Sequence, residues 1–187
     1  MNTKNELCSK AQALVPHIPS FFVTLNCDEN IQQYLLPLFE LYEICFPDDH
    51  YMTIKLLKGI LTLCKNNKSK IIVDSSNNST NVIGGLFVLE GGKYIENGYG
   101  SEGDANTYII FNIFVHPKYQ CKGYASLMLT NLFSALESGQ MIQLITREDN
   151  VGAQWLYIKH KFKHVKTLKN YYKHVNKDGF LFELKEP

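Results

Sequence analysis

The most informative chemistry in the sequence lies in a short stretch between an apolar run and a predicted helix. It covers residues 115–125 and reads VHPKYQCKGYA. The first N–H groups of a helix have no partner inside it and lie at the positive end of its dipole. Gly123 leaves space for a ligand beside the backbone, and Lys118 and Lys122 add positive charge. The stretch predicts a binding site for a phosphate or pyrophosphate, with an ordinary strand-to-helix turn as the alternative.

The same stretch differs from two common phosphate-binding loops. It lacks the three-Gly spacing of dinucleotide-binding folds and the Gly-Lys-Ser/Thr of the NTPase loop. It resembles the acetyl-CoA motif of the GCN5-related N-acetyltransferases, Gln/Arg-x-x-Gly-x-Gly/Ala, through Gln120, Gly123 and Ala125. In that family the main-chain amides of this loop hold the pyrophosphate of coenzyme A. The resemblance implies acetyl-CoA as co-substrate, bound by Phe114, Val115, Gln120, Cys121, Lys122, Gly123, Tyr124 and Ala125.

A second match to the family begins 27 residues after Gly123, at Asn150. Residues 150–162 resemble its Asn-x-x-Ala-x-x-x-Tyr-x-x-x-Gly-Phe, with Lys161 in place of the Gly. The resemblance implies that Asn150 binds the pantetheine arm, although a helix cap would also use Asn there. It also implies that Tyr157 contacts the cofactor and protonates the leaving thiolate. The alternative is that Tyr157 has no catalytic role and is an aromatic side chain packed under the helix.

The implied reaction is direct attack of an amine on the thioester. Main-chain N–H groups near Phe114 and Val115 would polarise the acetyl carbonyl. In the family's N-terminal acetyltransferases, a His base on the fifth strand corresponds to Ile145, and its partner Tyr aligns with Ile109. Tyr108 fits that partner only with a one-residue bulge. The catalytic candidates are therefore Tyr157, Tyr108 and His116, with His50 and Glu148 as other possible bases.

Two kinds of amine fit the sequence as acceptors of the acetyl group. A third possibility is that the protein is an acyl-CoA-binding module that catalyses no reaction. Our first prediction is glucosamine 6-phosphate, because the missing His and the single domain resemble the divergent protozoan enzymes for that sugar. Lysines would bind its phosphate. The alternative is a protein N-terminus, because residues 46–51 and 170–180 resemble the Phe-Pro-x-x-Tyr turn and the C-terminal hairpin of N-terminal acetyltransferases. The substrate-binding candidates are Phe46, Tyr51, Lys55, Tyr171, Tyr172 and Lys173.

The hydrophobic pattern predicts the elements that position these residues. Strands are expected at 21–25, 71–74, 82–90, 108–115, 141–146, 165–168 and 180–184. Helices are expected from a cap at Asp28 or Asn30 to residue 45, and at 53–64, 125–136 and 151–160. Residues 91–106 contain five Gly and are expected to form a loop. The order gives a mixed α/β structure with one sheet. The family resemblance makes it a mostly antiparallel seven-stranded sheet flanked by four helices.

Length and composition set the remaining limits. The 187 residues suggest an arm at 1–20 and one acetyltransferase domain at 21–187. A net charge of +1 gives no case for nucleic acid or membrane partners. Five scattered Cys and six His form no metal-ligand spacing, so no metal is expected and the thiols are expected to be reduced. No secretory signal is recognised, which predicts a cytoplasmic protein, and the last strands could pair two copies into a homodimer.

Overall fold

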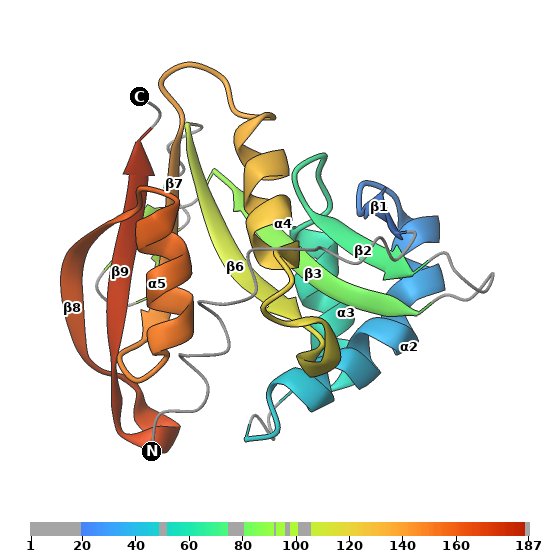
Figure 1. Cartoon of the computed structure of the whole chain (residues 1–187), viewed down its shortest axis with the longest axis horizontal. Helices are drawn as coiled ribbons and strands as arrows, with labels where there is room; N and C mark the ends of the chain where they lie inside the picture. The colour runs from blue at the N-terminus through green and yellow to red at the C-terminus, as the bar shows by residue number, and fades with distance from the viewer. Residues whose placement is uncertain are drawn as a thin grey trace. The chain divides into compact units, whose positions relative to one another are not determined.

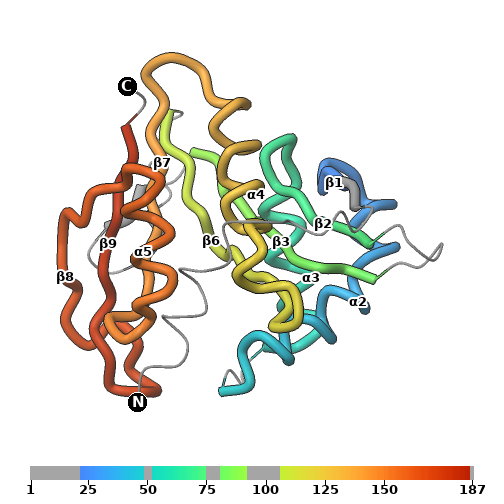
Figure 2. The backbone as a smooth tube through the Cα atoms, in the orientation of Figure 1, coloured from blue at the N-terminus to red at the C-terminus, as the bar shows by residue number. Residues whose placement is uncertain are grey.

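Residues 20–48, 52–74, 81–91, 93–95, 98–100 and 106–185 are described by the computed structural model. Their order is β1 (Ser20–Thr24), α2 (Asp28–Cys45), α3 (Ile54–Leu63), β2 (Lys70–Asp74), β3 (Val82–Glu90), β4 (Lys93–Ile95), β5 (Gly98–Gly100), β6 (Thr107–Val115), η1 (Pro117–Tyr119), α4 (Tyr124–Phe133), β7 (Met141–Arg147), α5 (Val151–Lys159), β8 (Lys163–Tyr172), η2 (Lys173–Val175) and β9 (Lys177–Lys185). Figure 1 labels the four α-helices and the strands other than β4 and β5, and Figure 2 traces the backbone.

Seven strands form one sheet in the order β1-β2-β3-β6-β7-β9-β8. The pairs β1–β2, β2–β3, β7–β9 and β8–β9 are antiparallel, and β6–β7 is parallel. Four α-helices accompany the sheet in the described part of the chain. The predicted fold class, a mixed and mostly antiparallel seven-stranded sheet with four helices, is therefore confirmed.

The chain divides into two compact units, and each is considered by itself. The first unit contains residues up to Phe87 together with Ile113–Met128, and the second contains Val88–Asn112 and the residues from Leu129 onward. The proposed boundary between an arm at 1–20 and a domain at 21–187 remains a prediction. Residues 1–19 lie outside the described residues, and Ser20 already belongs to β1.

In the first unit, helix α2 buries one apolar face. Ile31, Leu35, Leu38 and Tyr42 recur at helical spacing and are buried, as the pattern predicts. The predicted capping of this helix is wrong: its N-cap is Cys27, without a side-chain cap bond, and Asn30 instead donates to the carbonyl oxygen of Thr24 at 2.8 Å. The second helix, α3, begins after a capping side chain, because the Thr53 hydroxyl accepts the N–H of Leu56 at 3.1 Å.

In the second unit, α5 covers one face of β7, β9 and β8 (Figure 1). Tyr157 belongs to this helix and its side chain is buried. Its ring centroid lies 5.7 Å from that of Phe162 and 5.8 Å from that of Phe182. The helix ends at Lys159, and Lys161, two residues further on, has φ +67° at the position where the resemblance to the family places a Gly. Gly adopts this left-handed conformation at less cost, so the Lys makes the end of α5 less stable.

Several predicted boundaries differ from the structure. The expected loop at 91–106 contains the short hairpin β4–β5, which forms a two-stranded sheet of its own. Strand β8 runs over Lys163–Tyr172, well beyond the predicted 165–168, and α4 ends at Phe133 instead of 136. No helix in the described residues is long and apolar enough to cross a lipid bilayer.

Candidate active site

The glycine-containing loop after β6 is held by bonds to the last residue of that strand. The carbonyl oxygen of Val115 accepts Nε2 of Gln120 at 3.0 Å and the Sγ–H of Cys45 at 3.6 Å. The side chain of Gln120 therefore folds back onto the strand end and fixes the start of the loop. Its amide is used for positioning, so within this loop a ligand would be held by main-chain groups.

The loop itself is accessible and tightly turned. Gln120, Cys121 and Gly123 are exposed, and Cys121 and Gly123 have φ values of +58° and +85°. The Gly123 carbonyl accepts the N–H of Leu127 at 2.9 Å and so starts the hydrogen bonding of α4. A Cβ built at Gly123 would meet no atom within 4 Å. The helix start thus faces open space, as an anion-binding turn requires.

A contact that the sequence did not reveal orders the two lysines of this turn. The ring of Tyr119 has Nζ of Lys118 at 5.6 Å and Nζ of Lys122 at 5.3 Å from its centroid. The Tyr119 hydroxyl donates to Asp74 at 3.5 Å, and burial followed by the Asp74 charge raises the pKa of Tyr119. The two residues are 45 positions apart, so no local pattern could have indicated this pair.

His116 is engaged in local structure. Its Nδ1 accepts the N–H of Lys118 at 3.1 Å and caps the 3-10 turn η1. A neutral imidazole that accepts through Nδ1 carries its proton on Nε2 and has no second lone pair to offer. Using His116 as a base would break the cap, so this residue does not enter the mechanism proposed below.

The end of β6 packs unusually close to β3. A Cβ at Gly84 would lie 2.6 Å from the carbonyl oxygen of Phe114, so only Gly fits there. The Phe114 ring packs edge-on against Tyr42, Phe46 and Phe87, at centroid distances of 6.0, 5.9 and 5.4 Å. Phe46, a predicted substrate contact, belongs to this aromatic cluster. Together, the cluster and Gly84 fix the backbone of Phe114 and Val115.

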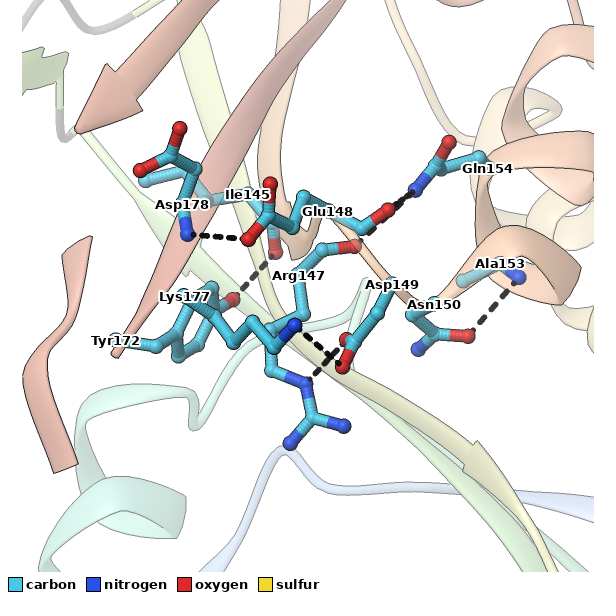
Figure 3. A network of polar contacts seen from close by, with 10 residues as sticks. All are labelled: Ile145, Arg147, Glu148, Asp149, Asn150, Ala153, Gln154, Tyr172, Lys177 and Asp178. Carbon is cyan, nitrogen blue, oxygen red and sulfur yellow. Dashed lines mark hydrogen bonds and ion pairs between the residues drawn. The ribbon is translucent and has the colours of Figure 1, made fainter. Parts of the chain in front are cut away.

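In the second unit, two side chains fix the turn from β7 to α5 (Figure 3). Asn150 caps α5, because its Oδ1 accepts the N–H of Ala153 at 3.2 Å. Its Nδ2 has no partner among the described residues, so capping leaves a donor for a ligand. Gln154, which the sequence did not single out, donates to the carbonyls of Arg147 at 3.2 Å and Glu148 at 2.8 Å. These bonds shape the turn at the N-terminus of α5.

A charged network borders this turn. Nε of Arg147 contacts Asp149 at 2.7 Å, and Nζ of Lys177 lies 3.9 Å from the same carboxylate. The hydrogen bond from Arg147 lowers the pKa of Asp149, followed by the charges of Arg147 and Lys177. Glu148 accepts the N–H of Asp178 at 3.2 Å (Figure 3). Its carboxylate forms no ion pair within 4.0 Å with a described residue, although, after the contact with Asp178, its charge also raises the pKa of Lys169.

The predicted hairpin tyrosines have different environments. Tyr171 and Tyr172 form an edge-on pair with centroids 5.0 Å apart. The Tyr172 hydroxyl donates to the carbonyl oxygen of Ile145 at 3.4 Å (Figure 3), and burial raises the pKa of this phenol. The bond joins the end of β8 to β7 at Ile145, the position of the family's base. The β-carbon of Tyr171 lies 3.0 Å from a Cβ built at Gly179, so the hairpin is tightly packed.

Comparison with known proteins decides the family. Residues 35–162 match the acetyltransferase (GNAT) family. The chain belongs to this family. The matched residues include the turn at residues 120–125 described above.

Individual relatives agree with this assignment. The chain is 31% identical over 101 residues to the ribosomal protein bS18-alanine N-acetyltransferase of Haemophilus ducreyi, which covers 48% of this chain and 70% of that protein. The fold of the present chain is similar to that of NAA60 from Arabidopsis thaliana in complex with acetyl-CoA. The TM-score is 0.68, the identity is 18%, and the match covers 89% of this chain and 99% of that chain. A chain of the NatC complex bound to Gag peptide and CoA gives a TM-score of 0.67, 18% identity and coverage of 90% and 99%.

Strand register places Tyr108 on the face opposite Ile145. Residues in register on neighbouring strands point to the same face, and faces alternate along a strand. Leu144 pairs with Phe182, which packs on Tyr157 of α5, and Ile110 is in register with Leu144. Tyr108 therefore lies on the α5 face, whereas Ile145 lies on the other. The pairing of β6 with β7 shows no bulge between Thr107 and Ile110, and the Tyr108 hydroxyl accepts Nε2 of Gln140 at 3.3 Å. Tyr108 therefore does not enter the mechanism proposed below.

The remaining candidates are placed as follows. Lys55 is exposed on α3, and Lys173 is exposed in η2. His50 and Tyr51 lie outside the described residues. Among the described residues, no group of three or more His, Cys, Asp or Glu side chains is arranged to hold a metal ion. Cys27, Cys45, Cys64 and Cys121 are free thiols.

Proposed function

We propose that this GNAT acetyltransferase transfers the acetyl group of acetyl-CoA to the α-amine of a protein N-terminus. The observation that carries the proposal is the β8–β9 hairpin, whose Tyr172 hydroxyl is bonded to β7 at Ile145. This arrangement lines the acceptor side of β7 with two tyrosines, and the neighbouring cations Arg147 and Lys177 are already engaged with Asp149. An extended peptide end suits such a surface better than a sugar phosphate does.

The names of the relatives support the same acceptor. The Haemophilus ducreyi protein acts on an alanine of a ribosomal protein, and the NatC chain was solved with a peptide and CoA. Glucosamine 6-phosphate, our first prediction from the sequence, receives no support from these relatives. The alternative from the sequence, a protein N-terminal α-amine, therefore becomes the proposed substrate.

The loop at residues 120–125 is proposed to bind the pyrophosphate of acetyl-CoA. Its support is the exposed helix start, the open space at Gly123 and the two lysines ordered by Tyr119. Asn150 is proposed to donate through Nδ2 to a pantetheine carbonyl while its Oδ1 caps α5. One side chain thereby serves both of the roles that the sequence left open.

In the proposed reaction, the neutral α-amine attacks the thioester carbonyl, an N–C bond forms and the C–S bond breaks. An α-amine has a pKa of about 7.7–8.0, so a weak base suffices to remove its proton. Glu148 is the proposed acceptor of that proton, directly or through water, because Asp149 and Asp178 are each paired with a cation. Main-chain N–H groups near Phe114 and Val115 are proposed to stabilise the oxyanion.

The thiolate of CoA is proposed to receive a hydrogen bond from Tyr157 as the C–S bond breaks, and to take its proton from solvent afterwards. Burial, followed by the neighbouring Tyr172, raises the pKa of Tyr157, so its phenol remains a hydrogen-bond donor to the thiolate. We expect Tyr157→Phe to lower kcat about 10²-fold and to change the Kd for CoA less than threefold, because the donor acts late in the reaction. Rapid-mixing kinetics together with calorimetric CoA binding separate the two quantities. An unchanged kcat would remove Tyr157 from the mechanism.

The function itself is tested by one acceptor panel. It contains an Ala-initiated peptide, a Met-initiated peptide, the same peptides blocked at the N-terminus but with an internal Lys, and glucosamine 6-phosphate. We expect kcat/KM for at least one free peptide to exceed that for the sugar and the blocked peptides by about 100-fold. Preference for the sugar, or acetylation of the internal Lys, would contradict the proposal. CoA binding without any acetyl transfer would identify a degenerate binding module.

A further inference from the structure

Helix α5 carries an apolar stripe that no described residue covers. Val151, Trp155 and Ile158 follow one another at spacings of four and three residues, and their exposed fractions are 46%, 64% and 52%. Tyr157 points the other way and is buried against Phe182, so the stripe is the outward face of the helix. Single exposed apolar side chains are common, but three on one helix face that include a Trp indicate a surface that is covered in function.

The same part of the chain is strongly basic. Residues 150–177 contain seven Lys, three His and no Asp or Glu. The other 159 residues contain 12 Lys or Arg and all 18 Asp and Glu, which gives them a net charge of −6. The net charge of +1, from which the sequence argued against membrane and nucleic acid partners, therefore averages two regions of opposite sign. Local charge decides what a surface attracts.

Two of these lysines lie next to the apolar stripe. Lys159 ends α5 and Lys161 follows it, and both are exposed. Lys163 at the start of β8 is in register with Glu183, which neighbours Phe182 and so lies on the sheet face opposite α5, and it is therefore not counted with them. The ion pairs found in this segment engage two other lysines, Lys169 and Lys177. Among the described residues, Lys159 and Lys161 have no acidic partner.

We propose that five residues, Val151, Trp155, Ile158, Lys159 and Lys161, form an α5 patch that binds the surface of an anionic lipid bilayer. The apolar stripe would enter the headgroup region, where Trp is strongly favoured, and the lysines would contact lipid anions. Long lysine stems let the ammonium groups reach the headgroups while the stripe is inserted. Binding of this kind is peripheral and reversible.

Other kinds of binding partner would contact only some of the residues of the patch. A nucleic acid would use the lysines and could stack on Trp155, but it would leave Val151 and Ile158 against a charged backbone. A stable protein interface needs about 800 Å² from each partner, far more than one stripe of three side chains supplies. A bilayer surface uses both the apolar and the basic residues and requires no matching shape.

The only Trp of the chain lies in the patch, so its fluorescence reports on the patch alone. The full chain is titrated with vesicles of phosphatidylcholine, and with vesicles that also contain phosphatidylserine. We expect Trp155 emission to shift to shorter wavelength, and the protein to co-sediment, only with the anionic vesicles and only at low salt. Lys159→Gln combined with Lys161→Gln should weaken this binding about 25-fold, because one Lys near such a surface contributes about fivefold.

Matched variants on the other unit control for charge and apolarity. Lys58→Gln with Lys65→Gln removes the same charge, and Leu63→Ala removes a side chain that is 74% exposed on α3. These variants should bind anionic vesicles as the parent chain does, whereas Trp155→Ala should lose most of its co-sedimentation. The proposal is overturned if anionic vesicles do not bind, or if the control variants lose binding equally. It is also overturned if single-stranded RNA binds and quenches Trp155 while the vesicles do not.

Discussion

Replacing Gly123 with Val is expected to weaken acetyl-CoA binding by about 100-fold or more. Gly123 has φ +85° and a Cβ there would point into open space, where the proposed pyrophosphate lies. A Val side chain would occupy that space and hold the phosphate away from the main-chain N–H groups, whose contacts depend on close approach. Calorimetric titration with CoA gives the loss directly, since no acceptor amine is needed.

The left-handed conformation adds a second effect that must be separated from the first. A side chain at positive φ costs about 1–2 kcal/mol wherever it occurs. Gly139 provides the matched control, because it has φ +82° and a Cβ there also meets nothing within 4 Å. Gly139→Val and Gly123→Val should lower the unfolding temperature by similar amounts, but only Gly123→Val should lose CoA affinity. Equal CoA affinity in the two variants would show that the pyrophosphate lies elsewhere.

Local signals in the sequence were sufficient for most of the elements and for the turn at residues 120–125. The apolar run of β6 is almost continuous, and Gly123 follows it at the turn where a left-handed residue is needed. Asn150 stands directly before the first residue of α5, where capping requires a short polar side chain. Each of these features is determined by residues within a few positions, so one sequence reveals them.

Features that depend on distant residues could not be predicted in this way. The face occupied by Tyr108 depends on the register between β6 and β7, and spacing in the sequence does not reveal whether a strand contains a bulge. Strand β8 was predicted too short because lysines interrupt its alternation. Lysines on an edge strand are common, since they discourage pairing with other chains. The Asp74–Tyr119 contact likewise joins segments that only the fold brings together.

The distribution of charge was also missed, because the net charge of the whole chain conceals two regions of opposite sign. The net value of +1 is the sum of a basic segment on α5, β8 and η2 and an acidic remainder. The apolar stripe on α5 was equally hidden, because Trp155 and Tyr157 belong to one motif and only the structure shows that they face opposite ways. Burial separates the residue proposed for catalysis from the residue proposed for surface binding.

Replacing Gly84 with Ala is expected to lower kcat about 100-fold while the KM for acetyl-CoA changes little. The added Cβ would lie 2.6 Å from the main-chain oxygen of Phe114, and a backbone atom cannot rotate away as a side chain can. The Phe114–Val115 segment must therefore move by several tenths of an ångström. Displacements approaching 1 Å in the groups that hold the reacting carbonyl cost about 10²-fold in rate. The proposed pyrophosphate loop keeps its own bonds to Val115, so cofactor affinity should persist.

Gly85→Ala is the matched control for this variant. Its Cβ would meet the Phe114 ring at 3.0 Å and the Phe87 ring at 3.2 Å, so the contact is with side chains that can adjust. Both variants should lower the unfolding temperature, but only Gly84→Ala should reduce kcat out of proportion to stability. Steady-state kinetics at saturating peptide, beside thermal unfolding of the same samples, measure both effects. If kcat falls equally in the two variants, the glycine at position 84 serves packing alone, and the oxyanion is stabilised by groups other than the end of β6.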